Sequence, residues 1–578
     1  MKKLFLAAAL LAVLPWSVSA QVEKQVEVTK AYVPSVESAA KLALDPDMTD
    51  TVKLRPEIDY TITPLSLRTT LATRPIRPAT VTYWEFNRPL PFYLKVGAGY
   101  PLNSVLDFYA SSQNRATGYV MGYVNHEGRY ADIENDFGVK SNSTRMLNRV
   151  GLAAGKYLGR RVLEGELSYD NRLYHRYGNY LPEALRPEAL SDAPGSLADY
   201  SDIAASVRIG DDFQNLDRTN FEVALHWDMF LDHSDSDAAQ SARQMTFGAS
   251  AKIARAIGRS HFSVEAGWNM IKGQKAFDGD DQQMLRVGAR YGLDGGVVRL
   301  EAGADYYHDR TETPADPDPF VETGNYLVPF LRLDLNLGTP GLKPFVEADG
   351  AVCPNDFRSL TRQNPYGVGP MWLDKSSVDY NGRVGLGGAL WRGKFNYRIY
   401  AGFSVRDNHL YWTNPIVRYN GDKDFAADLA VPEMARQKVT SFNGEIDYRP
   451  VGRLKLSLGV HGYVYDDDTR LENGAPAFEG NIGIRYESRK VSFGVNALMQ
   501  SERSWTMSRA AADMVSPADL ETYRVPFAAD LRVDFDWKIT QRAGLFAEGR
   551  NLLNRKLYEF ALYPEYGANF TLGVKLNF

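Results

Sequence analysis

The chain has 578 residues, of which 66 are Lys or Arg and 71 are Asp or Glu, and its formal net charge is −5. This acidic balance is the opposite of what a nucleic-acid-binding protein needs. After the first twenty residues the chain has no apolar run of about 18 residues or more, which excludes a bundle of membrane-spanning helices. The single cysteine, Cys353, excludes an intramolecular disulfide framework.

Residues 1–20 have the pattern of a secretory signal peptide. Lys2 and Lys3 precede an apolar segment from Leu4 to Trp16, and Val18-Ser-Ala20 is typical of a cleavage site. An uncleaved membrane anchor is the weaker interpretation, because the apolar segment is short and ends in small residues. We therefore expect residues 1–20 to be removed and the protein to be exported.

Residues 21–91 differ in composition from the rest of the chain. They contain eight of the 29 prolines and alternate poorly between apolar and polar positions. Proline has no backbone N–H to give to a strand ladder, so a regular sheet is not expected here. We predict a short Pro-rich N-terminal arm that lies in the periplasm or in a lumen.

From residue 92 to residue 578, alternating segments are separated by tight turns. Leu454, Leu456 and Leu458 share one face of such a segment, and Lys455 and Ser457 lie on the other. Short, often basic turns occur at 158–161, 257–260, 338–341, 391–394, 450–453, 487–490 and 539–542. Long polar connections occur at 172–199, 232–237, 278–281, 309–324, 352–377, 406–436 and 501–521. Short turns that alternate with long loops are typical of outer-membrane barrels.

The pattern therefore predicts an all-β protein, a transmembrane antiparallel β-barrel that occupies residues 92–578. The number of alternating segments indicates about 22 strands, within a range of roughly 18–22. An even number of strands places both ends of the chain on the periplasmic side. Residues 97–123 allow more than one division into strands.

One segment carries charge on a single face. Asp530, Arg532, Asp534 and Asp536 alternate with Leu531, Val533, Phe535 and Trp537. If the apolar face meets lipid, the four charged side chains face the lumen. They would either line a polar pathway for a solute or pair with basic residues on neighbouring strands, and buried charge favours the second interpretation.

The final nine residues alternate strictly and end on an aromatic residue. The apolar positions are Phe570, Leu572, Val574, Leu576 and Phe578. Such a strand meets lipid on one side and a wet lumen on the other. We predict that it closes the barrel, and that it is the strand through which the barrel-assembly machinery engages the protein. Outer-membrane lipid would be its other partner, and no nucleic acid is expected.

The C-terminal region resembles that of TonB-dependent receptors. The resemblance covers Gly544–Arg555 with its Asn-Leu-Leu-Asn turn, Tyr563-Pro-Glu-Tyr-Gly567 and the last strand. It implies a 22-strand barrel in the cell outer membrane and a role in uptake. Such receptors carry a plug domain of more than a hundred residues before the barrel, and only about 71 residues lie here between the signal and the first strand. Val26-Glu-Val-Thr29 is at most a weak TonB-box-like segment.

Residue patterns for catalysis or metal binding are missing from the sequence. It has no Walker loop, G-x-S-x-G elbow or H-E-x-x-H motif, and we expect neither an enzyme nor a cofactor. His233 lies among Asp232, Asp235 and Asp237, and Asp466–Asp468 is acidic. In both places a solvated loop is favoured over a cation site, and no metal site is predicted.

Two functions fit these observations. The first is a barrel for solute uptake or pore function that resembles a TonB-dependent receptor without a plug, with the arm 21–91 in the lumen. The alternative is a structural or assembly scaffold that docks another envelope protein or a surface lipoprotein. The position of the arm, in the lumen or in the periplasm, discriminates between them.

Overall fold

A computed structural model describes residues 90–578, apart from 115–116, 135–139, 179–196, 214, 235–241, 316, 368, 370, 420–422, 427–429, 468–470 and 510–519. The expected signal peptide and nearly all of the expected arm lie outside the described residues. Within the described ranges, no helix has the length and apolar character needed to cross a membrane.

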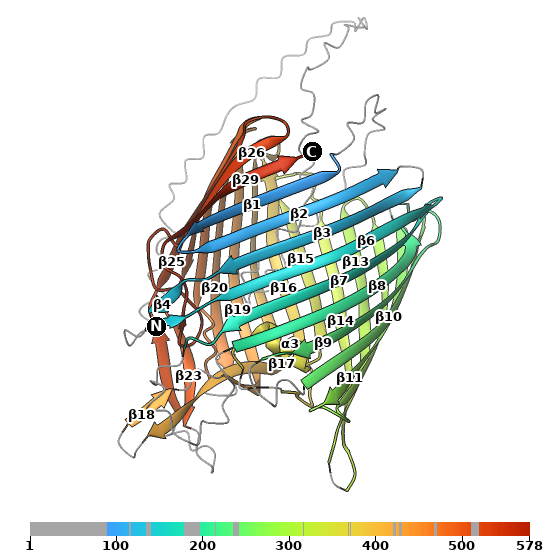
Figure 1. Ribbon diagram of the computed structural model, residues 1–578. Coiled ribbons are helices and arrows are strands. Elements are labelled where there is room, and N and C mark those ends of the chain that lie inside the picture. Colours follow the sequence, from blue (N-terminus) through green and yellow to red (C-terminus); the bar gives the residue numbers. More distant parts are fainter. Residues whose placement is uncertain are drawn as a thin grey trace, which may run out of the picture. The chain divides into compact units, whose positions relative to one another are not determined.

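The described residues form a closed antiparallel barrel of 22 strands, which confirms the predicted fold class (Figure 1). The first half of the wall consists of β1 (Phe92–Tyr100), β2 (Asn103–Asn114), β3 (Gly118–Arg129), β6 (Arg145–Leu158), β7 (Arg161–His175), β8 (Leu197–Asp211), β9 (Asn220–Asp232), β10 (Ala242–Ile257), β11 (Ser260–Lys275), β12 (Asp281–Asp294) and β13 (Val298–Thr313). The second half consists of β14 (Phe320–Leu335), β15 (Lys343–Cys353), β16 (Ser377–Leu390), β17 (Phe395–Tyr419), β19 (Val431–Val451), β20 (Leu454–Asp467), β21 (Phe478–Glu487), β22 (Val491–Gln500), β25 (Ala528–Lys538), β26 (Ala543–Arg550) and β29 (Asn569–Asn577).

Shorter elements lie in the connections between wall strands. The hairpin of β4 (Asp132–Glu134) and β5 (Lys140–Asn142) follows β3, and α3 (Phe357–Gln363) follows β15. The single turn η3 (Trp391–Gly393) joins β16 to β17. Near the C-terminus are β18 (Lys423–Ala426), β23 (Arg503–Arg509), β24 (Leu520–Val525), β27 (Tyr558–Phe560) and β28 (Tyr563–Pro564).

Alternation sorts the wall residues into two faces. On β11, Phe262, Val264 and Trp268 are exposed, and on β29 so are Phe570 and Leu572. A band of exposed apolar side chains around a closed barrel faces the hydrocarbon of a membrane, because water would leave that surface unfavourably hydrated. This exterior places the protein in the outer membrane, as the C-terminal pattern predicted.

β29 closes the barrel by pairing with β1 over eight residue pairs, from Tyr93 with Asn577 to Tyr100 with Phe570. Beyond the ladder, Phe92 and Phe578 exchange two backbone hydrogen bonds of 3.0 and 3.1 Å, and their rings stack at 5.2 Å. The first and last residues of the barrel segment therefore lie at the same opening of the barrel, which we call the turn end. Tight turns also lie there, such as those at Gly159 and Gly258, where φ values of 68° and 63° favour glycine.

The opposite end, which we call the loop end, carries the long connections 130–144, 176–196, 354–376, 501–527 and 551–568. Outer-membrane barrels have short periplasmic turns and longer extracellular loops, so the loop end faces outward from the cell. Two of the expected long connections are shorter than predicted, because β13, β14, β17 and β19 extend through most of 309–324 and 406–436. These strand ends carry polar residues on both faces, and a polar strand looks like a loop in the sequence.

The terminal aromatic ring leads to a testable expectation. Replacing Phe578 with Asn removes the ring that stacks on Phe92 and should lower the amount of folded protein in the outer membrane. A Phe578→Tyr variant, which keeps the ring, is the matched control and should assemble normally. The measurement is the heat-modifiable band on cold SDS gels of outer-membrane fractions. Equal amounts of folded Asn and Tyr variants would contradict a role for the ring.

Candidate lumen gate at the loop end

The connection 354–376 enters the barrel and carries α3. Asp356 caps the helix, because its side chain accepts a hydrogen bond of 3.1 Å from the backbone N–H of Ser359. Phe357 and Leu360 are buried, so the short helix is held by packing rather than by its own length. The connection leaves the wall at β15 and β16, yet its side chains contact β8, β9 and β10, which places α3 inside the barrel (Figure 1).

Ion pairs hold α3 against this distant wall. The guanidinium of Arg358 contacts Asp202 on β8 at 2.7 Å and Asp228 on β9 at 3.0 Å. Arg362, one turn further along α3, contacts the same Asp202 at 2.6 Å. Both carboxylates are nearly fully buried, with 2 % and 4 % of their surface exposed. Removing one member of such a buried group is costly, because it leaves the other charges without a partner.

Aromatic packing strengthens the same contact. The ring of Phe357 lies 5.2 Å from that of Phe230 on β9 and 5.1 Å from that of Phe277, which lies in the turn between β11 and β12. Trp372, further along the connection, lies 5.7 Å from Phe277. Aromatic pairs at these distances add to the stability that burial alone provides.

A second connection, 551–568, folds toward the first. Asn551 and Asn554 adopt left-handed φ values of 49° and 50°, which asparagine tolerates better than most residues. The Asn551 side chain donates hydrogen bonds to the carbonyls of Arg555 and Tyr566. The Asn-Leu-Leu-Asn turn recognised in the sequence thus has a physical role, because it bends the chain back across the barrel mouth.

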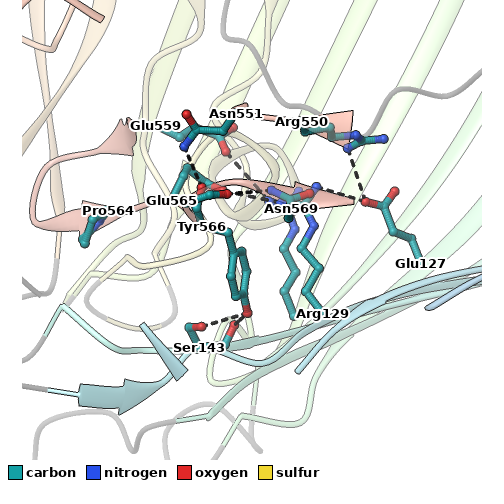
Figure 2. Close-up of polar contacts among 12 residues, drawn as sticks. Glu127, Arg129, Ser143, Arg550, Asn551, Glu559, Pro564, Glu565, Tyr566 and Asn569 are labelled. Carbon is teal, nitrogen blue, oxygen red and sulfur yellow. Dashed lines mark hydrogen bonds and ion pairs between the residues drawn. The ribbon is translucent and has the colours of Figure 1, made fainter. Parts of the chain in front are cut away.

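Polar contacts anchor this connection to the opposite side of the β1–β29 junction (Figure 2). The hydroxyl of Tyr566 lies 2.8 Å from Ser143 Oγ and donates to the backbone carbonyl of Ala131. Glu565 contacts Arg129 on β3 at 3.6 Å. At the base of the connection, Arg550 contacts Glu127 at 3.7 Å. The residues that anchor 551–568 therefore lie in the connection 130–144 and at the end of β3.

The two connections meet at a group of tyrosines that we call the tyrosine junction: Tyr174, Tyr177, Tyr366 and Tyr563. The rings of Tyr366 and Tyr563 stack at 3.7 Å, and Tyr177 packs edge-on against Tyr563 at 5.0 Å. The Tyr177 hydroxyl donates to the carbonyl of Pro564. All four side chains are buried. Burial raises the pKa of Tyr366 and of Tyr177 well above the usual value, so both hydroxyls stay neutral.

The positions of these contacts around the wall show that the connections cross the lumen. Counted along the barrel from β1, β7 is the fifth strand, β16 the fourteenth and β26 the twenty-first. They are spaced by nine, seven and six strands around the wall, so they lie in three different sectors of the circumference. Side chains carried by all three sectors touch at the tyrosine junction, and this requires the connections to reach inward. We call 354–376 and 551–568 together the gate.

A hairpin beside the gate supports one of its two parts. β23 and β24 place Trp505, Met507 and Val525 against Tyr558 and Leu562 in a compact apolar cluster. Arg503 donates to the carbonyl of Tyr558. The connection 551–568 is therefore held on two sides, by the hairpin and by the anchors on β3.

A cavity of about 390 Å³ adjoins α3. Its lining includes Asp228 and Thr246 from the wall and Arg358 and Arg362 from the gate. His226, which precedes Asp228 by two residues on β9, also lines the cavity and lies nearer the turn end. The volume falls in the range typical of small-ligand sites, but the space is partly open and its lining is mostly polar, whereas such sites are usually lined by apolar side chains.

The four charged residues predicted on β25 all have charged partners. Arg532 pairs with Asp530 at 2.6 Å, Asp534 lies 3.6 Å from Arg485, and Asp536 pairs with Lys575. Asp530 also accepts a hydrogen bond of 2.8 Å from the backbone N–H of Asn551. Asp530 therefore supports the base of the gate. The sequence analysis did not predict this contact.

Sequence reasoning missed the rest of the gate as well. The sequence marks the Asn-Leu-Leu-Asn turn and the Tyr563–Gly567 segment within 551–568, but gives no sign that this connection meets 354–376. Among the described residues, no three His, Cys, Asp or Glu side chains gather in a way that would hold a metal ion. Asp235 and Asp237, considered as neighbours of His233, lie outside the described residues.

Asp280, in the turn beside Phe277, predicts a pH dependence. Burial, with a smaller contribution from Asp281, raises the pKa of Asp280 to about 6, above the ordinary value of about 3.9. The folded turn binds the proton more tightly than an opened turn does. The stability that this proton contributes to the turn is therefore fully present below about pH 4 and is lost as the pH rises through about 6.

Hydrogen–deuterium exchange measures this effect locally. Corrected for intrinsic exchange rates, protection of residues 276–281 should fall between about pH 4 and pH 7. An Asp280→Asn variant should keep its protection across that range, and the turn 295–297 of the same protein is the internal control. The explanation fails if the Asn variant shows the same loss of protection as the parent.

Comparison with protein-family models and with curated proteins finds no match. Solved structures do match. The FrpB iron transporter from Neisseria meningitidis aligns with 85% of this chain and 82% of its own, at 12% identity and a TM-score of 0.64.

Two further structures give similar values. The pyoverdine outer membrane receptor FpvA from Pseudomonas aeruginosa aligns with 86% of this chain and 79% of its own, at 11% identity and a TM-score of 0.60. The ferric-catecholate import receptor Fiu from E. coli K12 aligns with 85% and 82%, at 10% identity and a TM-score of 0.58. At sequence identities this low, the similarity shows the fold alone. The described part of this chain has the barrel fold of TonB-dependent outer-membrane receptors, as the C-terminal resemblance implied.

Proposed function

We propose that this protein is an outer-membrane barrel for solute uptake whose outer mouth is closed by its own gate. The observation that carries the proposal is the stacking of Tyr366 on Tyr563, because it joins two connections that start a third of the circumference apart. A barrel of 22 strands is too wide to be filled by wall side chains alone. A gate of buried aromatic and charged contacts closes such a lumen and retains the means to open it.

In this proposal the protein differs from a plugged receptor. Closure at the loop end is provided by the gate, and the arm 21–91 would fill the lumen from the turn end in place of a plug. An extended Pro-rich segment suits a narrow space, because it leaves fewer backbone donors without partners. The charged face of β25 would line the lumen and hold its neighbours through ion pairs, without a catalytic role.

A conductance experiment tests the proposal. Four forms of the protein are compared in planar bilayers: the full chain, a deletion of residues 21–88, a replacement of 355–375 by a Gly-Ser linker, and the two changes combined. The combined form should pass large, stable currents, and the full chain should pass almost none. Heat-modifiable mobility on gels confirms that each form is folded. A folded combined form that stays silent would contradict a gated lumen.

The single changes separate the two closures. Conductance on loss of 355–375 alone assigns the main barrier to the gate, and conductance on loss of the arm alone assigns it to residues 21–88. If the arm lies in the lumen, deleting residues 21–88 should raise the conductance sharply, at least in the form that also lacks 355–375.

A scaffold function has one specific observation in its favour. β17 continues past the wall and pairs with β18 and β23, and β23 pairs with β24, so a small sheet extends the barrel at the loop end. Exposed sheet edges can pair with a strand of another protein. Pull-down with the full chain and with a variant lacking 416–426 would test it, since an envelope protein or lipoprotein held by this sheet is lost only from the variant.

A further inference from the structure

We propose that Asp202 and Asp228 form a recognition site for a solute that carries a guanidinium group, and that Arg358 of the gate occupies this site while the gate is closed. The inference rests on the proposed uptake function and names the class of solute. The solute would compete with Arg358 and release α3 from the wall.

The structure already shows a guanidinium in this place. Arg358 uses its Nε and Nη2 atoms toward one oxygen of Asp202 at 2.7 Å and its Nη1 atom toward Asp228 at 3.0 Å. A planar fork of N–H donors that bridges two carboxylates is the geometry that a guanidinium satisfies and a spherical ammonium does not. Asp202 and Asp228 lie on neighbouring strands, β8 and β9, and so keep their spacing whether or not α3 is present.

The site also has unused acceptors. Oδ2 of Asp228 and Oδ1 of Asp202 have no hydrogen-bond partner among the described residues, although both side chains are more than nine-tenths buried. A buried acceptor without a donor is costly, so a ligand that supplies an N–H there gains stability. Asp228 lines the cavity of about 390 Å³ beside α3, which gives a small solute a place to bind next to the carboxylate.

The surroundings of Arg358 also disfavour its position. Arg362 shares Asp202 with it, so two cations of α3 lie close together and repel each other. An arriving guanidinium that donates to the free oxygen of Asp228 would then take over the contact that Arg358 makes with that residue. A ligand shifts such an equilibrium only by its difference in affinity for the two states. The open state, in which Arg358 no longer competes, is the state that binds the solute better.

Calorimetry with L-argininamide tests the inference on the detergent-solubilised full chain. The control probe is citrulline amide, which replaces the guanidinium with a neutral urea of the same shape. An Arg358→Met variant should bind argininamide at least about tenfold more tightly than the parent, because the internal competitor is gone. Adding Asp228→Asn to that variant should abolish the gain. Citrulline amide should bind neither form measurably.

Heat-modifiable mobility shows whether each variant is folded. If Arg358→Met does not fold, the parent and the single Asp228→Asn variant are compared, and argininamide should bind the parent only. Equal binding of the two probes, or argininamide binding that survives loss of the Asp228 charge, would overturn the inference.

The binding result and the function can fail separately. Argininamide that is bound by Arg358→Met, in a barrel whose gate deletion never conducts, would leave the site standing and remove the uptake function. A gate deletion that conducts, in a barrel that ignores argininamide, would leave the gate standing and remove this site.

Discussion

A barrel in which Tyr366 and Tyr563 are both replaced by alanine should conduct ions at voltages where the parent protein is closed. The two rings form the central stack of the tyrosine junction and are exposed by only 6 % and 1 %. Truncating one buried aromatic side chain costs about 3–5 kcal/mol. A loss of about 3 kcal/mol already changes an equilibrium by about a hundredfold or more, so the balance between closed and open gate should shift strongly.

Single-channel recording in planar bilayers measures this shift as open probability. The double Tyr→Phe variant at the same positions is the matched control, because it retains the stack and loses only the hydroxyls. That control should remain closed. If the alanine and phenylalanine variants have the same open probability, the stack does not hold the gate, and closure would have to come from the contacts of α3 alone.

Replacing Phe546 with alanine should cause the largest loss of barrel stability among single substitutions near the closing strands. The ring of Phe546, on β26, is 3 % exposed. It lies over the paired glycines Gly97 and Gly573, where a Cβ atom at either position would approach the ring to 2.7 or 2.5 Å. Lys95 and Lys575 lie 4.6 and 5.2 Å from the ring centre. The ring thus covers the β29–β1 junction from inside.

We expect Phe546→Ala to lower the free energy of unfolding by about 3–5 kcal/mol, because a cavity remains over the glycine pair. Urea unfolding of the protein in lipid vesicles, followed by tryptophan fluorescence, measures the change. The control is Leu545→Ala on the same strand. Leu545 is 39 % exposed, and lipid can refill the space that this substitution leaves. Equal losses for the two variants would show that the ring has no special role at the junction.

Much of the architecture was predictable because a membrane barrel repeats one simple rule. Every second residue of a wall strand must suit lipid, and this requirement marks strands such as β20, β25 and β29 in the sequence itself. The tight turns were equally visible, since glycine at Gly159 and Gly258 provides the left-handed φ that the turn needs. The strand count and the outer-membrane location therefore followed from local patterns. The expected loops at 309–324 and 406–436 were too long, because strands that continue beyond the lipid no longer obey the rule.

By itself, the sequence predicted the barrel, the strand that ends it and the likeness to TonB-dependent receptors, because each depends on neighbours along the chain or on the terminal strand. Only the tertiary structure decided which side chains join the connections at the loop end. The gate joins Arg358 to Asp202 and Asp228, and Tyr366 to Tyr563, across sequence separations that no local pattern records. In water-exposed connections neither lipid nor a strand ladder imposes a repeating pattern, so the inward fold of 354–376 and 551–568 arises from specific pairs of side chains that meet only when the barrel is closed.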